Sequence, residues 1–304
     1  MSTTLYFAKL NLVSDDLFEL YKDPRERKTI SSALYDAIHA GQHWEKQSTY
    51  TDETGQLHTT TIDYFIQVLD VKEQVQTYIE GWLYKESTLH LKKLVNGHLV
   101  SRPEKNIEAN RFILDVDHGF VGYNTSNRFG YKDFVEAFEN IVNLNEHFLQ
   151  RSYRYNMCIC TSGLNLEDIK RELKAIGNIK ELRICMQPPN PSDDVLDSLQ
   201  QGYDGWLEQM ESARATQFQA LYSTKGSSGL NLDSPLISTR IDDIGQLYSH
   251  VSVEESTTKG YVSVEALSTN GKKYSSGDSK PIKRIIKNAG DIFHACIDVF
   301  RQLK

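Results

Sequence analysis

The stretch 153–191 changes its hydrophobic period twice, and this change constrains the fold more than any other feature of the chain. Residues 157–160 form an apolar run typical of a strand, and residues 182–186 form a second apolar strand. Between them, apolar residues recur at helical spacing: Leu164, Leu166, Ile169, Leu173 and Ile176. Asn165 is placed as a helix N-cap and Gly177 as a stop. The pattern predicts a βαβ crossover, in which two parallel strands are neighbours or near neighbours and the helix packs on their sheet.

Alternating apolar residues predict mainly antiparallel strands in the first half of the chain. Asn96-Gly97 is the strongest hairpin signal, and an amphipathic helix is expected to begin near Tyr131. Strands are predicted at residues 5–13, 60–71, 78–85, 89–95, 98–102, 111–116 and 120–124, and further helices at 15–22 and 29–40. These elements predict an N-terminal α+β domain, residues 1–150, built on an antiparallel β-meander.

A second α+β domain is predicted for residues 151–304. It contains the crossover, a hairpin at Asn270-Gly271 and a long C-terminal helix from about Lys280 to Leu303, with Pro281 at its first position. The segment 224–234, rich in glycine and serine, predicts a flexible tether within this domain. The predicted fold class is therefore α+β throughout.

The composition indicates a cytoplasmic protein with no segment inserted in a membrane. No apolar window approaches the roughly 18 residues that a membrane span needs, and the first residues lack the pattern of a secretory signal. The cysteines Cys158, Cys160, Cys185 and Cys296 lie in apolar segments, which predicts reduced, buried thiols without a structural metal. The net charge of −7 argues against a protein that coats nucleic acid with its whole surface, but it permits a local basic face.

Asp115, Asp117 and His118 follow a predicted strand, at a position where metal-dependent nucleases often place carboxylates. Strand alternation predicts Asp115 and Asp117 on one face, although turns also favour aspartate and glycine for backbone reasons. The sequence contains no P-loop, HExxH or GxSxG motif. No catalytic residue, metal or cofactor is therefore predicted, and a metal-dependent nuclease using Asp115 and Asp117 is kept as an alternative.

A basic cluster near the end of the chain is the best candidate for a binding surface. Its six residues fall within sixteen positions and are interrupted by one acid, Asp278. Because four of them have helical spacing in the expected C-terminal helix, they are predicted to share one face. The cluster predicts binding to the backbone of double-stranded DNA with little sequence preference, and the alternatives are a solvated surface or a protein-interaction subunit without nucleic-acid binding. The cluster consists of Lys272, Lys273, Lys280, Lys283, Arg284 and Lys287.

Three segments resemble the RexA-type exclusion proteins of lambdoid prophages and related phage-defence proteins of bacteria. They are FILDVDHGFVGYNTSNRFGYKDFVEAF, YNMCICTSGLNLEDIKRELKAIGNIKELRICMQPP and KGYVSVEALSTNGKKYSSGDSKPI. The resemblance covers about residues 110–304 and rests on the order of elements rather than on identities. It implies a cytoplasmic, homodimeric α+β protein that binds DNA without strong sequence preference and acts in phage exclusion. It also implies signalling to a partner effector, for which a membrane protein encoded nearby is a candidate.

Overall fold

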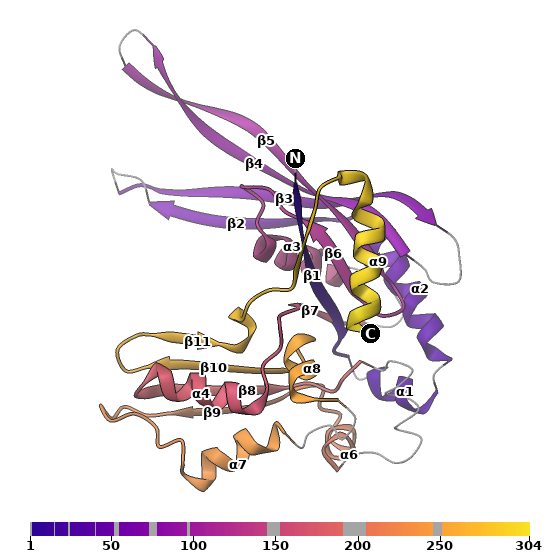
Figure 1. Cartoon of the computed structure of the whole chain (residues 1–304). Helices are drawn as coiled ribbons and strands as arrows, with labels where there is room; N and C mark the ends of the chain where they lie inside the picture. The colour runs from indigo at the N-terminus through magenta and orange to yellow at the C-terminus, as the bar shows by residue number, and fades with distance from the viewer. Residues whose placement is uncertain are drawn as a thin grey trace.

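Strand β1 (Thr3–Leu12) runs through the middle of the molecule in this computed structural model, with partner strands on both of its edges (Figure 1). One edge pairs with β6 (Phe120–Asn124), and the other pairs first with β12 (Lys283–Ile286) and then with β7 (Tyr155–Ile159). The structure describes residues 2–14, 16–23, 25–39, 41–51, 55–72, 78–95, 98–144, 153–190, 205–245 and 251–304. All the strand pairs around β1 are antiparallel.

The large sheet has the strand order β12-β1-β6-β5-β4-β3-β2, with β7 added beside β1. Its further strands are β2 (His43–Thr51), β3 (Leu57–Lys72), β4 (Tyr78–Val95) and β5 (His98–Asp115). Consecutive strands pair from β2 to β6, which confirms the predicted antiparallel meander. The separate strands predicted at 78–85 and 89–95 are one strand, β4, and those predicted at 98–102 and 111–116 both belong to β5. The predicted Asn96-Gly97 turn lies outside the described residues.

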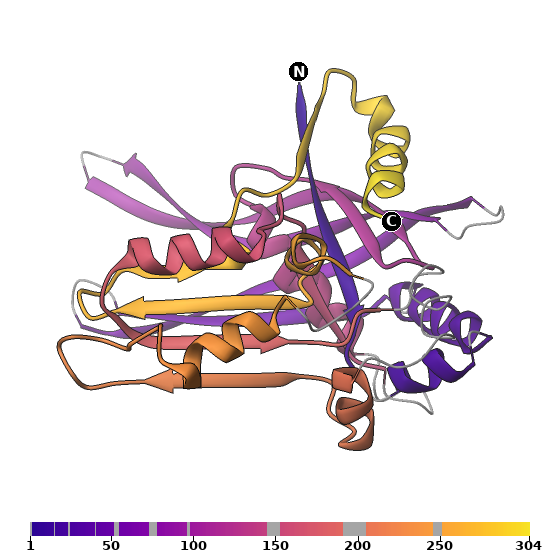
Figure 2. The same ribbon diagram turned by 60° about the horizontal axis from the view of Figure 1, so that its bottom comes forward.

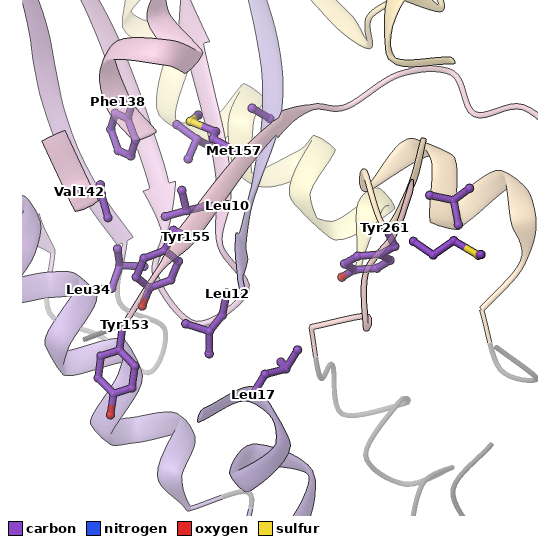
Figure 3. Packing of buried hydrophobic residues seen from close by; sticks show 14 of the residues in the cluster. Leu10, Leu12, Leu17, Leu34, Phe138, Val142, Tyr153, Tyr155, Met157 and Tyr261 are labelled. Atoms are coloured by element: carbon purple, nitrogen blue, oxygen red, sulfur yellow. The ribbon is translucent and has the colours of Figure 1, made fainter. Parts of the chain in front are cut away.

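Helices cover both faces of the large sheet, because β1 is apolar on both of its faces. Leu5 and Phe7 face α9 (Ile292–Leu303), where the Phe7 and Phe300 rings meet edge to face at 6.1 Å. On the other face, Leu10 and Leu12 belong to the larger core together with side chains of α2 (Glu26–His39) and α3 (Tyr131–Asn143) (Figure 3). Alternation along one strand therefore supplies two separate cores. The short helix α1 (Asp16–Lys22) adds Leu17 to the larger one.

A smaller antiparallel sheet follows in the chain, with the strand order β11-β10-β8-β9. Its strands are β8 (Ile179–Met186), β9 (Phe218–Ser223), β10 (Val262–Ser268) and β11 (Lys273–Ser275), as Figure 2 shows from a second side. Its helices are α4 (Leu166–Ile176), α6 (Gly205–Ser212), α7 (Pro235–Asp243) and α8 (Val253–Thr258). The predicted Asn270-Gly271 hairpin is confirmed between β10 and β11, and Gly271 has the positive φ of 84° that such a turn needs. Within the described residues, no helix is long and apolar enough to cross a membrane.

The predicted parallel pair at 157–160 and 182–186 is wrong. Strand β7 pairs antiparallel with β1 in the large sheet, whereas β8 pairs antiparallel with β9 and β10 in the small one. The helix between them is confirmed: the Asn165 side chain accepts a hydrogen bond from the Asp168 backbone N–H at 2.8 Å, and Gly177 ends α4 with a φ of 89°. Local periodicity gave the elements correctly, but it does not specify the sheet that each strand joins.

The predicted long C-terminal helix is also wrong in its first half. Residues 283–286 form β12, which pairs with Thr3–Tyr6, and the helix α9 begins at Ile292. Ile285 is 65% exposed and Ile286 only 7% exposed, which is the alternation of a strand. Pairing with the open edge of β1 satisfies backbone groups of this central strand, so tertiary context overrides the helical spacing of the apolar residues.

The segment 224–234, predicted as a flexible tether, is fastened to the beginning of β8. The backbone N–H of Thr224 donates to the carbonyl of Lys180 at 2.9 Å, and that of Leu230 donates to the carbonyl of Ile179 at 2.7 Å. Leu230 and Leu232 also pack against the larger core. These contacts hold the segment along the small sheet.

Leu173 gives a direct test of how α4 is held. The side chain is fully buried in the core that α4 shares with the small sheet. We expect Leu173→Ala to lower the free energy of unfolding by about 2 to 5 kcal/mol, because it removes buried apolar atoms and leaves a cavity. Urea unfolding of both proteins measures the difference. The exposed Lys174→Ala is the control, and a loss below about half a kcal/mol in Leu173→Ala would contradict this packing.

Candidate functional site

The basic cluster does not form the single helical face that its spacing predicts. Lys283 and Arg284 are neighbours on β12, so their side chains point to opposite faces of the sheet. Arg284 lies on the α9 side, where its Nη1 is 3.4 Å from the Asp298 carboxylate and 3.4 Å from the Ala295 carbonyl. Its charge is therefore directed towards an acid of α9 and away from the other lysines.

Three lysines of the cluster remain available on the surface. Lys280, Lys283 and Lys287 are exposed, and within the described part of the chain none of them has an ion-pair partner. Lys283 projects to the same side of β12 as the exposed Ile285, and Lys287 continues the same alternation just after the strand ends. Backbone geometry thus places Lys283 and Lys287 in a row at the edge of the large sheet.

Lys272 and Lys273 lie at a different place, on the hairpin of the small sheet. Lys273 begins β11 and borders a shallow polar groove together with Glu181, Glu265 and Asp278. Asp278, the one acid within the cluster, pairs with Lys132 of α3 at 2.7 Å. The structure therefore places Lys272 and Lys273 on the small sheet, away from Lys283 and Arg284 on β12, and Lys273 shares its groove with three carboxylates and Arg183.

Asp115 is a buried charged residue at the end of β5. The Asp115 Oδ1 accepts a hydrogen bond from the backbone N–H of His118 at 3.2 Å and lies 3.0 Å from the His118 Nδ1. Its Oδ2 forms an ion pair with the Lys304 Nζ at 3.0 Å. Burial tends to raise the pKa of Asp115, but the hydrogen bond and charge of His118, together with Lys304, outweigh it and hold the pKa below its usual value. The carboxylate is thus ionised, with His118 at one oxygen and the Lys304 ammonium at the other.

This arrangement does not fit a nuclease that uses Asp115 and Asp117 as metal ligands. Asp117 is half-buried in the turn after β5, whereas Asp115 is fully buried against His118 and Lys304. Among the residues that the structure describes, no group of three or more histidine, cysteine or acidic side chains converges as a metal site would. The geometry gives Asp115 a structural role, in which its contacts with His118 and Lys304 hold the turn in place.

Lys9 is a buried lysine outside the candidate residues that the sequence predicts. It lies on β1 and is 5% exposed, and its ammonium donates a hydrogen bond to the carbonyl of His118 and lies 4.5 Å from the centre of the Phe120 ring. Burial, together with the nearby charge of Lys259, lowers the pKa of Lys9 to about 7. Its position in the sequence could have indicated this, because Lys9 shares one face of the apolar strand β1 with Leu5 and Phe7.

All four cysteines are free. Cys160 and Cys296 are buried as predicted, but Cys158 and Cys185 are only half-buried. Burial raises the pKa of the Cys160 and Cys296 thiols to about 12, so these thiols stay protonated and are poor nucleophiles at neutral pH. They act as small core side chains.

No family model matches the chain, and no curated protein matches it.

Proposed function

We propose that this protein binds duplex DNA with little sequence preference, through the exposed lysines Lys280, Lys283 and Lys287. The observation that carries the proposal is that these lysines are exposed and have no ion-pair partners in the described chain, with Lys283 and Lys287 in a row at the edge strand of the large sheet and Lys280 just before that strand. Exposed lysines bind phosphates as point charges and release condensed counterions from DNA, a form of binding that needs no reading of bases.

The spacing of the row suits contact with a phosphate backbone. Lys283 and Lys287 are four residues apart in extended chain, which corresponds to about 13 Å. The residue between them on the same side, Ile285, is exposed and uncharged. Lys273 is less suited to the role, because Glu181 and Glu265 border the groove that it lines.

The biological role that we propose is that of a phage-defence component. The three resembling segments described above support it, because the proteins that they resemble act in phage exclusion. On the same support we propose a cytoplasmic homodimer that signals to a partner effector, with a membrane protein encoded nearby as one candidate. DNA binding would then be the step by which the protein detects or responds to infection.

The test is a triple replacement of Lys280, Lys283 and Lys287 by glutamate. We expect the wild-type affinity for duplex DNA to fall with a slope of roughly −3 in log affinity against log salt, since about three phosphates are neutralised. The variant should lose at least tenfold in affinity at low salt and keep its thermal stability, because exposed charges contribute little to folding. Fluorescence anisotropy with two unrelated duplexes measures both affinity and sequence preference.

A second triple variant separates local contact from net charge. Lys174, Lys180 and Lys225 are also exposed and unpaired among the described residues, so replacing them by glutamate makes the same change in charge elsewhere on the surface. This control should retain most of the DNA affinity. Equal losses in the two variants would overturn the proposed interface, as would a wild-type protein that binds no duplex at low salt.

A further inference from the structure

The face of the large sheet that carries α9 is covered by this helix only in part. The helix contacts the beginning of β4, where the Phe293 and Tyr78 rings meet edge to face at 5.9 Å. Strands β2 to β5 extend beyond α9, to the left in Figure 1. Because residues two apart on a strand share a face, the side of β4 that carries Tyr78 also carries Tyr84 and Glu86. Both are only half-buried, so this part of the face is open to solvent.

Three rings form an aromatic row across the open part of this face. His43 of β2 stacks on Phe65 of β3 with 4.8 Å between the ring centres, and Phe65 stacks on Tyr84 of β4 at 5.0 Å. These residues are direct partners in the strand pairing, so their side chains lie on one face. The next partner, Ala109 of β5, has no ring and ends the row. The His43 side chain is 54% exposed, and Phe65 and Tyr84 are half-buried.

A row of carboxylates lies beside the aromatic row, displaced by two residues on each strand. Glu45, Asp63 and Glu86 are again direct partners across β2, β3 and β4. Their partner on β5 is Ile107, an apolar side chain that is 55% exposed. One carboxylate oxygen of Asp63 lies 2.7 Å from the His43 Nδ1, which joins the two rows. The surface therefore combines apolar and acidic groups in register.

The carboxylates border a shallow groove of about 520 Å³. The acids that line it are Glu45, Asp63, Glu86 and Glu104. Lys105 is the one base in the lining, so four acids and one lysine leave a formal charge of −3. Lys105 pairs with Glu86 at 2.6 Å, whereas Glu45 is exposed and has no ion-pair partner in the described chain. The groove is thus acidic even after its internal pairing.

Rings beside carboxylates are a combination that attracts cations. A guanidinium or ammonium group is drawn to the face of an aromatic ring and pairs with acids, and the planar guanidinium also stacks on rings. Phosphates would be repelled by the same carboxylates, which disfavours nucleic acid at this place. Because Ala109 ends the aromatic row, a planar cationic group can continue the stack beside Tyr84.

We propose that this surface docks a segment of a partner protein rich in arginine and lysine, with its cationic side chains beside Glu45, Asp63 and Glu86 and its apolar side chains against the aromatic row. The proposal names the chemistry of the partner effector in the proposed function, and it rests on that part of it. It does not depend on DNA binding, since the lysines of that contact lie at β12 and the groove lies towards β2, at the other end of the strand order.

The experiment is fluorescence anisotropy of the full chain with a labelled hexapeptide of alternating arginine and valine. The same peptide with glutamine in place of arginine is the uncharged control, and it should bind at least tenfold more weakly. The triple variant Glu45→Gln, Asp63→Asn and Glu86→Gln should lose at least tenfold in affinity for the arginine peptide. Tyr84→Ala should lose about fivefold, and this loss should persist at high salt, because it removes a ring contact.

A matched triple variant makes the same change in net charge elsewhere on the surface. Glu208, Asp233 and Glu254 are exposed and have no ion-pair partners among the described residues. Glu208→Gln, Asp233→Asn and Glu254→Gln together should therefore keep the peptide affinity. Glu45→Gln alone removes one exposed, unpaired carboxylate and should lose about threefold, so it tests the surface even if the first triple variant does not fold.

Three results would overturn the proposal: no binding of the arginine peptide at low salt, equal affinities for the two peptides, or equal losses in the two triple variants. Binding of an oligothymidylate that Tyr84→Ala abolishes would assign the surface to stacking of nucleobases, and it would also overturn the proposal. The variants of the groove should keep their affinity for duplex DNA, and the glutamate variant of the β12 lysines should keep its peptide affinity. Failure of the docking surface is therefore distinguishable from failure of the DNA contact.

Discussion

Lys9→Met should raise the free energy of unfolding at neutral pH by about 2 to 4 kcal/mol. The pKa of Lys9 is about 7 in the folded protein and near 10.5 in the unfolded chain. At neutral pH the charged ammonium is therefore less favourable in the folded protein than in the unfolded chain, which lowers the free energy of unfolding of the wild type. Each pKa unit of this difference corresponds to about 1.4 kcal/mol in the free energy of unfolding. The hydrogen bond to His118, which Lys9→Met loses, offsets part of the stability that the replacement gains. Methionine fits the same position as a flexible apolar side chain.

The pH dependence identifies the cause of this stabilisation. Between about pH 7 and about pH 10.5 the unfolded chain holds the Lys9 proton and the folded protein does not, so the wild-type free energy of unfolding rises with pH. The free energy of unfolding of Lys9→Met lacks this rise. The difference in stability between Lys9→Met and wild type should therefore shrink towards zero near pH 10. Urea unfolding at about pH 7 and about pH 9.5 measures both differences. A variant less stable than wild type at pH 7, or an advantage that is the same at both pH values, would contradict the explanation.

Asp115→Asn should lower the free energy of unfolding by about 3 kcal/mol at neutral pH. The replacement removes a buried charge and leaves Lys304 and His118 without their acidic partner. Since the pKa of Asp115 is lower in the folded protein than in the unfolded chain, its stabilisation is present above about pH 4 and is lost as the pH falls through the folded value. The difference between wild type and Asp115→Asn should therefore narrow on acidification.

Asp117→Asn is the matched control for Asp115→Asn. Asp117 is the same residue type two positions further on, half-buried and without an ion pair in the described chain. It should change stability by less than about half a kcal/mol. Equal effects of the two replacements would mean that the contacts of Asp115 with His118 and Lys304 contribute nothing.

Local signals in the sequence predicted local structure well. The cap at Asn165, the stop at Gly177 and the turn at Asn270-Gly271 depend on neighbouring residues, and the structure confirms all three. Pairing between distant strands was not predictable in the same way. The strand at 283–286 has apolar residues that suit a helix or a strand, and only the free edge of β1, some 280 residues earlier, decides between them.

The same distinction applies to the candidate sites. The basic cluster was visible in sequence, but the division of its residues between two sheets depends on how β11 and β12 pair. The surroundings of Lys9 could not be predicted, because Lys9, His118 and Lys259 are more than a hundred residues apart from one another in the chain. The one local trace is a lysine at an inward position of an apolar strand.

The pairing of β1 with β12 also determines when this protein can finish folding during its synthesis. Thr3 pairs with Ile286, which is made 283 residues later, and at 5 to 20 residues per second this interval is roughly 15 to 60 s. Until then, one edge of the central strand and the apolar side chains of Leu5 and Phe7 lack the partners that β12 and α9 provide. The nascent chain therefore presents an open strand edge for most of its translation, the state in which binding by chaperones protects against aggregation.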